Sequence, residues 1–262
     1  MTEKELLLTA LLNCKRSDLY SQDFHLDKNQ EEKLSSMLRR RLNGEPVQYI
    51  TGFTEFMGFC FKVDRRALVP RPETEILVEK TLDLIKDKFG NKRINLLDLG
   101  TGSGNIAVSL AKLSRTLQVF ASDISQKALE VARENARINE VVHRINFLKS
   151  DLFENCFKHK FDIIISNPPY LTSEELDSSA IELNYEPRIS LEAGNDGLLF
   201  YRKIIKQAPR YLKKNGFLIF EIGYNQLEKI KTIAEDAREF IIEKTFRDYN
   251  GFERIIFLRK NN

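Results

Sequence analysis

The sequence predicts an α/β protein with a mostly parallel sheet covered by helices on both faces. From about residue 90 onward, short apolar runs rich in β-branched residues alternate with segments of helical spacing, as in parallel strands joined by helices. Two final apolar runs flank the turn sequence 248–251, which predicts a terminal antiparallel hairpin. We therefore expect two parts: a small helical domain with a β-hairpin over 1–66, and a sheet domain over 67–262.

Composition limits the possible partners. The 262 residues carry 41 basic and 38 acidic side chains, and a net charge of +3 gives no electrostatic reason to expect a nucleic-acid substrate. Cys14, Cys60 and Cys156 are too widely spaced for a zinc site or a disulfide framework, which favours a reducing compartment. No apolar run approaches the ~18 residues of a membrane span. We expect a cytoplasmic protein without a membrane partner.

The first part begins with helices. Leucines over 6–12 form one apolar face, Asp27 with Gln30 resembles a capping box at a second helix start, and Gly44 follows its end. The pattern then changes to alternation, which predicts an antiparallel hairpin. Its alternating apolar residues are Val47, Tyr49, Phe59, Phe61 and Val63. The prolines over 70–72 end this segment, and the acidic residues after them predict a helix start.

The second part supplies the sheet. The expected strands span 94–97, 118–122, 145–148, 161–165, 217–222, 240–246 and 254–258. The expected helices between them begin near 105 and span 126–139, 198–212 and 227–238, and Asn215-Gly216 is taken as the stop after 198–212.

A glycine-rich loop follows the first of these strands. Asp98 precedes it, and its residues are Gly100, Thr101, Gly102, Ser103 and Gly104. Nicotinamide-binding domains also carry such a loop, but their fingerprint requires a small residue at the sixth place, where Asn105 stands. Asp98 suits the cationic sulfonium and ammonium groups of S-adenosylmethionine better than a pyrophosphate. The loop therefore favours a methyl donor.

Acidic residues end the next two strands. Asp123 stands about twenty residues past the glycines, where a carboxylate accepts the ribose hydroxyls of either NAD or S-adenosylmethionine. Asp151 would accept from an adenine amine, although a solvated turn explains it nearly as well. The three histidines have no metal-ligand spacing, so we expect no metal site.

Asn167-Pro168-Pro169-Tyr170 ends the strand over 161–165. The prolines cannot continue a ladder, and loops at the carboxyl ends of parallel strands hold ligands. The Asn167 oxygen and the Pro168 carbonyl would accept the two N–H bonds of a planar amide or amine, with Tyr170 flat against it. Catalysis and substrate binding are therefore assigned to this loop. A strand-ending turn without a function is the alternative.

Together these motifs resemble class I S-adenosylmethionine-dependent methyltransferases. Segments 44–52, 69–75, 185–188 and 194–197 sharpen the resemblance to the peptide chain release factor glutamine methyltransferase family, the HemK/PrmC type. The resemblance implies a seven-stranded Rossmann-like sheet with a terminal antiparallel hairpin, S-adenosylmethionine as cofactor, and methylation of the Gly-Gly-Gln glutamine of class I release factors. It also implies that the helical domain holds the protein substrate. The sequence departs from the family pattern in two places: the first helical region is shorter than in typical members, as if the leading helix were absent, and Leu152 stands directly after the acidic residue near the adenine, where many members carry tryptophan, so an aromatic contact to the adenine is not carried over.

Two rival functions remain. DNA adenine-N6 methyltransferases use a similar loop, but they need a target-recognition region and a basic groove that this chain lacks. A non-catalytic adenosine- or tRNA-binding module would be indicated by a damaged Asn-Pro-Pro-Tyr loop, and here the loop is intact.

Overall fold

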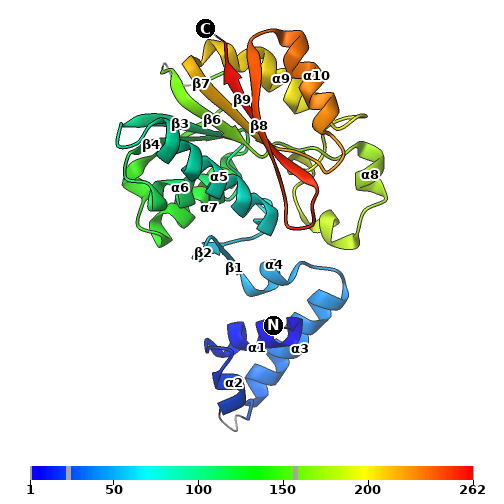
Figure 1. The fold of residues 1–262 in the computed structure, drawn as a ribbon. Coiled ribbons are helices and arrows are strands. Elements are labelled where there is room, and N and C mark those ends of the chain that lie inside the picture. Colours follow the sequence, from blue (N-terminus) through cyan, green and yellow to red (C-terminus); the bar gives the residue numbers. More distant parts are fainter. Residues whose placement is uncertain (1, 22–24, 156–158, 262) are drawn as a thin grey trace.

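The computed structural model describes residues 2–21, 25–155 and 159–261, so Cys156, one of the three cysteines expected to form no zinc site or disulfide, lies outside the described residues. Seven strands form one sheet in the order β5-β4-β3-β6-β7-β9-β8 (Figure 1). Their bounds are β3 Ile94–Leu99, β4 Leu117–Asp123, β5 Ile145–Lys149, β6 Phe161–Ser166, β7 Leu212–Glu221, β8 Phe240–Arg247 and β9 Glu253–Lys260. Strands β3 to β7 pair in parallel, whereas β9 pairs antiparallel with β7 and β8. The predicted sheet with its terminal antiparallel hairpin is confirmed.

Helices cover both faces of this sheet. Helices α5 Pro72–Lys88, α6 Asn105–Leu113 and α7 Gln126–Ile138 pack on one face, and α9 Leu199–Gln207 and α10 Leu227–Ala237 on the other. Neighbouring strand residues enter opposite layers: Leu96 packs into the first core and Leu97 into the second. Because residues on both faces of each strand are buried, the strands appear in the sequence as continuous apolar runs.

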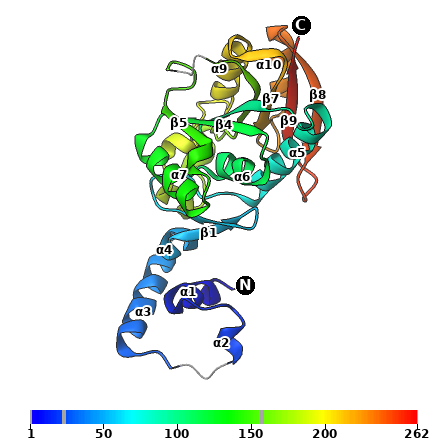
Figure 2. The same cartoon turned by 90° about the vertical axis from the view of Figure 1, so that its left-hand side faces the viewer.

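The N-terminal helices stand away from the sheet (Figures 1 and 2). They are α1 Glu3–Leu12, α2 Asp18–Ser21, α3 Lys28–Leu42 and α4 Val47–Thr51, followed by β1 Phe53–Phe56 and β2 Phe59–Lys62. The capping box of α3 is confirmed, because the Gln30 backbone N–H donates to Asp27 Oδ1 at 2.8 Å and the Asp27 backbone N–H donates to Gln30 Oε1 at 3.0 Å. Phe56 and Phe61 of the hairpin are buried in the same core as apolar residues of α5 and α6.

The expectation that Val47 and Tyr49 belong to the hairpin was wrong. Both lie in the short helix α4, which follows Pro46 and ends at Gly52 with φ +83°. Helical geometry buries the adjacent Tyr49 and Ile50 together, and the Tyr49 hydroxyl donates to the Ala67 carbonyl at 2.7 Å. The antiparallel pairing itself, between β1 and β2, is confirmed.

The expected helix over 198–212 was also too long. Helix α9 ends at Gln207, a 3-10 turn Ala208–Arg210 contains Pro209, and β7 already begins at Leu212. Asn215-Gly216 therefore lies inside the strand, where the pairing with β6 shifts register. A Cβ on Gly216 would lie 3.0 Å from the Lys213 carbonyl oxygen, so this irregularity favours glycine.

The remaining elements are short. They are α8 Ser173–Asp177 and the 3-10 turns Val142–Arg144, Ile181–Tyr185 and Arg188–Ser190. Across the described ranges, no helix combines the length and the apolar character needed to cross a bilayer.

Candidate active site

The glycine-rich loop joins β3 to α6 at the carboxyl edge of the sheet. Gly100, Gly102 and Gly104 all have positive φ, at +78°, +54° and +82°, a region that favours glycine. At Gly104 a Cβ would also lie 3.0 Å from the Ala132 Cβ. The Gly100 amide donates to the Ser122 carbonyl at 2.9 Å, which ties the loop to β4.

Asp98 supports this loop from beneath. Its side chain is fully buried, and Oδ2 accepts from the Thr101 hydroxyl at 2.6 Å and from the Ala107 amide at 3.2 Å. Oδ1 has no hydrogen-bond partner among the described residues. Burial raises the Asp98 pKa to about 7, because desolvation disfavours the charged form. The side chain thus holds the loop and the start of α6 together.

Asp123 ends β4 at the same edge. Its Oδ1 accepts from the Ser125 amide at 2.8 Å and its Oδ2 from the Gly102 amide at 2.9 Å. Burial raises the Asp123 pKa, while these backbone hydrogen bonds act in the opposite direction. Each carboxylate oxygen keeps further acceptor capacity for a ligand.

A cavity of about 260 Å³, here called the glycine-loop cavity, lies above this edge. The predicted site residues that line it are Gly100, Thr101, Gly102, Ser103, Asp123, Asp151, Leu152, Asn167, Pro168 and Pro169. Three predicted residues lie outside its wall: Asp98, Gly104 and Tyr170. Asp98 and Gly104 shape the loop from behind, whereas Tyr170 lines a second cavity.

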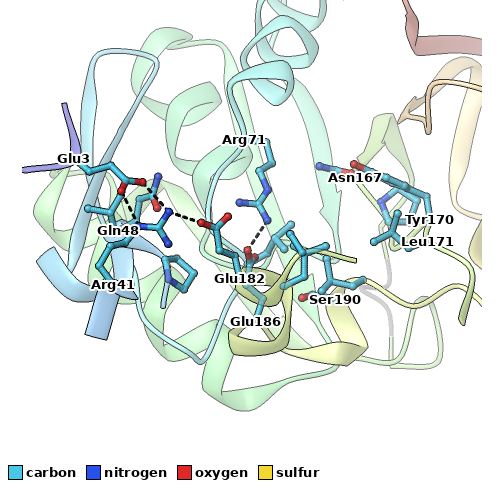
Figure 3. Close-up of a pocket in the computed structure, with 17 residues that line it drawn as sticks. Glu3, Arg41, Gln48, Arg71, Asn167, Tyr170, Leu171, Glu182, Glu186 and Ser190 are labelled. Atoms are coloured by element: carbon cyan, nitrogen blue, oxygen red, sulfur yellow. Dashed lines mark hydrogen bonds and ion pairs between the residues drawn. The ribbon is translucent and has the colours of Figure 1, made fainter. Parts of the chain in front are cut away.

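That second cavity, here called the Arg41 cavity, has a volume of about 520 Å³. Figure 3 shows Glu3 and Arg41 of the N-terminal helices on one side and Asn167 and Tyr170 on the other. Arg41 pairs with Glu3 at 2.8 Å and with Glu182 at 2.5 Å, so it joins the N-terminal helices to the segment after the Asn-Pro-Pro-Tyr loop. The cavity is therefore walled by both parts of the chain.

The two cavities share a wall that includes Asn167 and Pro168 of the Asn-Pro-Pro-Tyr loop, together with Leu68, Arg71 and Ser190. Pro169 lines only the glycine-loop cavity, and Tyr170 lines only the Arg41 cavity. Ligands in the two cavities would therefore both lie next to the start of the Asn-Pro-Pro-Tyr loop.

Tyr170 is held by its backbone and by burial. Its carbonyl accepts from Gln226 Nε2 at 3.0 Å, and a Cβ on Gly197 would lie 2.5 Å from that same oxygen. Glycine is therefore required at 197. Burial raises the Tyr170 pKa to about 12, so the ring presents a neutral phenol.

Sequence reasoning missed three polar residues of this site. Thr74, Glu221 and Arg71 were not assigned roles, yet Asn167 Nδ2 lies 3.2 Å from Thr74 Oγ1, which donates to Glu221 Oε2 at 2.6 Å. Arg71 lines both cavities and pairs with buried Glu186 at 2.5 Å. Glu221 carried a usable signal, since it is the only carboxylate in the apolar run 217–222.

Comparisons with known proteins agree with this geometry. Residues 2–52 match the PrmC N-terminal domain, and residues 74–183 match the methyltransferase small domain. A release factor glutamine methyltransferase from Thermodesulfovibrio yellowstonii is 39% identical over 261 residues, covering 99% of this chain and 92% of that protein. The chain belongs to the release factor glutamine methyltransferase family. A family member from Lactococcus lactis subsp. lactis is 42% identical over 235 residues, covering 88% of this chain and 84% of its own length.

Solved structures agree on the fold. The ribosomal protein L11 methylase of Lactobacillus delbrueckii subsp. bulgaricus superposes with a TM-score of 0.53 at 25% identity, covering 76% of this chain and 84% of that chain. The predicted family and the class I methyltransferase fold are thus confirmed, and the protein is a methyltransferase.

Proposed function

We propose that this chain transfers a methyl group from S-adenosylmethionine to the side-chain amide of the glutamine in the Gly-Gly-Gln motif of class I release factors. The observation that carries the proposal is the wall shared by the two cavities at Asn167 and Pro168. A transferase for two substrates needs such a junction, because donor and acceptor atoms must approach to within about 3–3.5 Å. Family membership supports the choice of substrate.

The glycine-loop cavity suits the donor. Positive-φ glycines leave its wall free of side chains at Gly100 and Gly102, where a Cβ would meet only open space. Asp123 would accept from the ribose hydroxyls, Asp151 from the adenine amine, and Leu152 would supply an apolar surface beside the ring. Once bound, the donor supplies an electrophilic methyl group on a sulfonium. Asp98, beneath the loop, would hold the donor's binding surface in place.

The acceptor amide belongs in the Arg41 cavity. A glutamine amide attacks poorly because its nitrogen lone pair is delocalised into the carbonyl. The Asn167 oxygen would accept one N–H and the Pro168 carbonyl the other, while the Tyr170 ring lies against the planar group. With both N–H bonds held, the face of the nitrogen is open to the neighbouring cavity. After transfer the nitrogen loses a proton to water or to the Asn167 oxygen.

The N-terminal helices would bind the rest of the release factor. Their residues Glu3 and Arg41 wall the cavity opposite Asn167, so a peptide loop that fills the cavity would contact them. Contacts of this kind are remote from the reacting atom and would raise the reactivity of an intact factor over a short peptide.

The test is to incubate the protein and labelled donor with a purified class I release factor and, separately, with duplex and single-stranded DNA. Label in the factor alone supports the proposal. Label in DNA and none in the factor would establish the adenine methyltransferase alternative. No label in any acceptor, from protein that binds the donor, would support the non-catalytic module.

A further inference from the structure

We propose that Thr74 and Glu221 are positioning residues that hold the Asn167 side-chain amide with its oxygen directed at the acceptor. The inference deepens the proposed function and rests on it for the identity of the acceptor. Neither residue would touch the glutamine. Both would act through Asn167, by deciding which end of its amide group faces the junction of the two cavities.

Three distant segments build this arrangement. Asn167 follows β6, Thr74 lies in the first turn of α5, and Glu221 ends β7. Asn167 Nδ2 donates to Thr74 Oγ1 at 3.2 Å, and Thr74 Oγ1 donates to Glu221 Oε2 at 2.6 Å. Thr74 and Glu221 are each only 1% exposed, so water cannot easily replace either partner.

The number of available protons fixes the direction of the hydrogen bonds from Asn167 through Thr74 to Glu221. An ionised carboxylate only accepts hydrogen bonds, so the single hydroxyl proton of Thr74 must go to Glu221. The hydroxyl oxygen is then left to accept from Asn167, and the matching group is the Asn167 NH₂. The Asn167 oxygen must therefore point the other way. An asparagine without these partners would present oxygen or NH₂ with little preference, and NH₂ would repel the N–H bonds of the acceptor.

The Glu221 environment adds a pH dependence. Burial raises its pKa to about 7, while the hydrogen bond from Thr74, the positive charge of Arg254 on β9 and a hydrogen bond from the Asn167 side chain favour the ionised form. The other titratable groups facing it are Glu73 on α5, Tyr170 after β6 and Tyr201 on α9. Protonated Glu221 can donate to Thr74, and the hydroxyl can then donate to a flipped Asn167 oxygen. Methyl transfer should therefore accelerate as pH rises through the ionisation of Glu221.

The main test uses Thr74→Val, which keeps the shape of the side chain and removes its hydroxyl. We expect kcat to fall about ten-fold, the worth of one hydrogen bond, with the affinity for the methyl donor within about two-fold of wild type. Thr74→Ser should recover most of the lost rate. Thr81→Val is the matched control, because Thr81 is buried in the same helix and its hydroxyl donates only to the Leu77 carbonyl at 2.7 Å.

Two kinetic results would overturn the inference. One is an unchanged kcat in Thr74→Val. The other is an equal loss in Thr74→Val and Thr81→Val, which would indicate a general packing effect within α5.

A second measurement does not depend on methyl transfer. In protein labelled with ¹⁵N at asparagine, the Asn167 NH₂ signal should shift in Thr74→Val and stay in place in Thr81→Val. If the wild type methylates no release factor but this shift occurs, the substrate proposal fails and the positioning role stands. If methylation proceeds and the signal does not move, the positioning role fails and the substrate proposal stands.

Glu221→Gln tests the pH dependence. In the wild type, kcat should fall as pH drops below the pKa of Glu221. The variant should lack this pH dependence, because glutamine does not titrate. The variant should also be several-fold slower at high pH, since its amide is able to donate to Thr74 as well as accept. The same ionisation in wild type and Glu221→Gln would assign it to another group and refute this part of the inference.

Discussion

Truncation of Asn167 separates donor binding from methyl transfer. Asn167→Ala removes the only amide side chain that lines both cavities among the described residues, and it leaves Asp123 and the glycine loop untouched. The loss of one positioned transition-state hydrogen bond costs about a hundred- to a thousand-fold in rate. The fold should tolerate the change, because Asn167 is half-buried and Thr74 keeps Glu221 as a partner.

The assay is single-turnover transfer of labelled methyl to an intact release factor, with donor affinity measured separately by calorimetry. Asn250→Ala, an exposed asparagine in the β8–β9 turn, is the control and should match wild type in both. Asn167→Asp should fall between wild type and Asn167→Ala, because a carboxylate still accepts an N–H bond. Full activity in Asn167→Ala would refute the proposed mechanism.

Three further results are expected. Asp123→Ala should weaken donor binding about ten- to a hundred-fold, as expected for hydrogen bonds to a charged group, and unchanged affinity by calorimetry in a folded variant would remove Asp123 from the site. Gly104→Ala should lower the free energy of unfolding by about 1–3 kcal/mol in urea titrations. The backbone at 104 has a positive φ that strains alanine, and the added Cβ would lie 3.0 Å from the Ala132 Cβ. The pKa values of buried Asp98 and Glu221 are both raised to about 7 in the folded protein. Between about pH 4 and pH 7 the unfolded chain has lost these protons and the folded protein still holds them, so the free energy of unfolding should fall as pH rises through this interval. Unfolding experiments that find stability rising over that interval would contradict the assigned pKa directions.

The strands were predictable because a strand buried on both faces of a sheet is a continuous run of apolar residues in the sequence. The run 161–165 was expected as a strand, and β6 spans Phe161–Ser166. Short runs next to a proline were not predictable in this way. Val47 and Tyr49 fit a strand and a helix equally over so few residues, and only the burial of adjacent Tyr49 and Ile50 decides for the helix. In the same way, nothing local showed that Asn215-Gly216 interrupts a strand instead of ending a helix.

In the site, too, local sequence patterns were predictable and contacts between distant segments were not. The glycine loop, Asp123 and the Asn-Pro-Pro-Tyr loop were found because each is a local pattern at a strand end. The contact between Thr74 and Glu221 joins residues 147 positions apart, and the pair of Arg41 and Glu182 likewise spans both parts of the chain. Such contacts depend on how α5, β7 and the N-terminal helices pack, which no single motif encodes.

The most direct test of the central claim is the position of the methyl group. A purified class I release factor and a short peptide with the same Gly-Gly-Gln sequence would be treated with the protein and donor, digested and analysed by tandem mass spectrometry. We expect one added methyl group, on the side-chain amide of that glutamine, formed much faster in the intact factor than in the peptide. A methyl group on any other residue would contradict the substrate assignment, and equal rates on peptide and factor would contradict the docking role of the N-terminal helices.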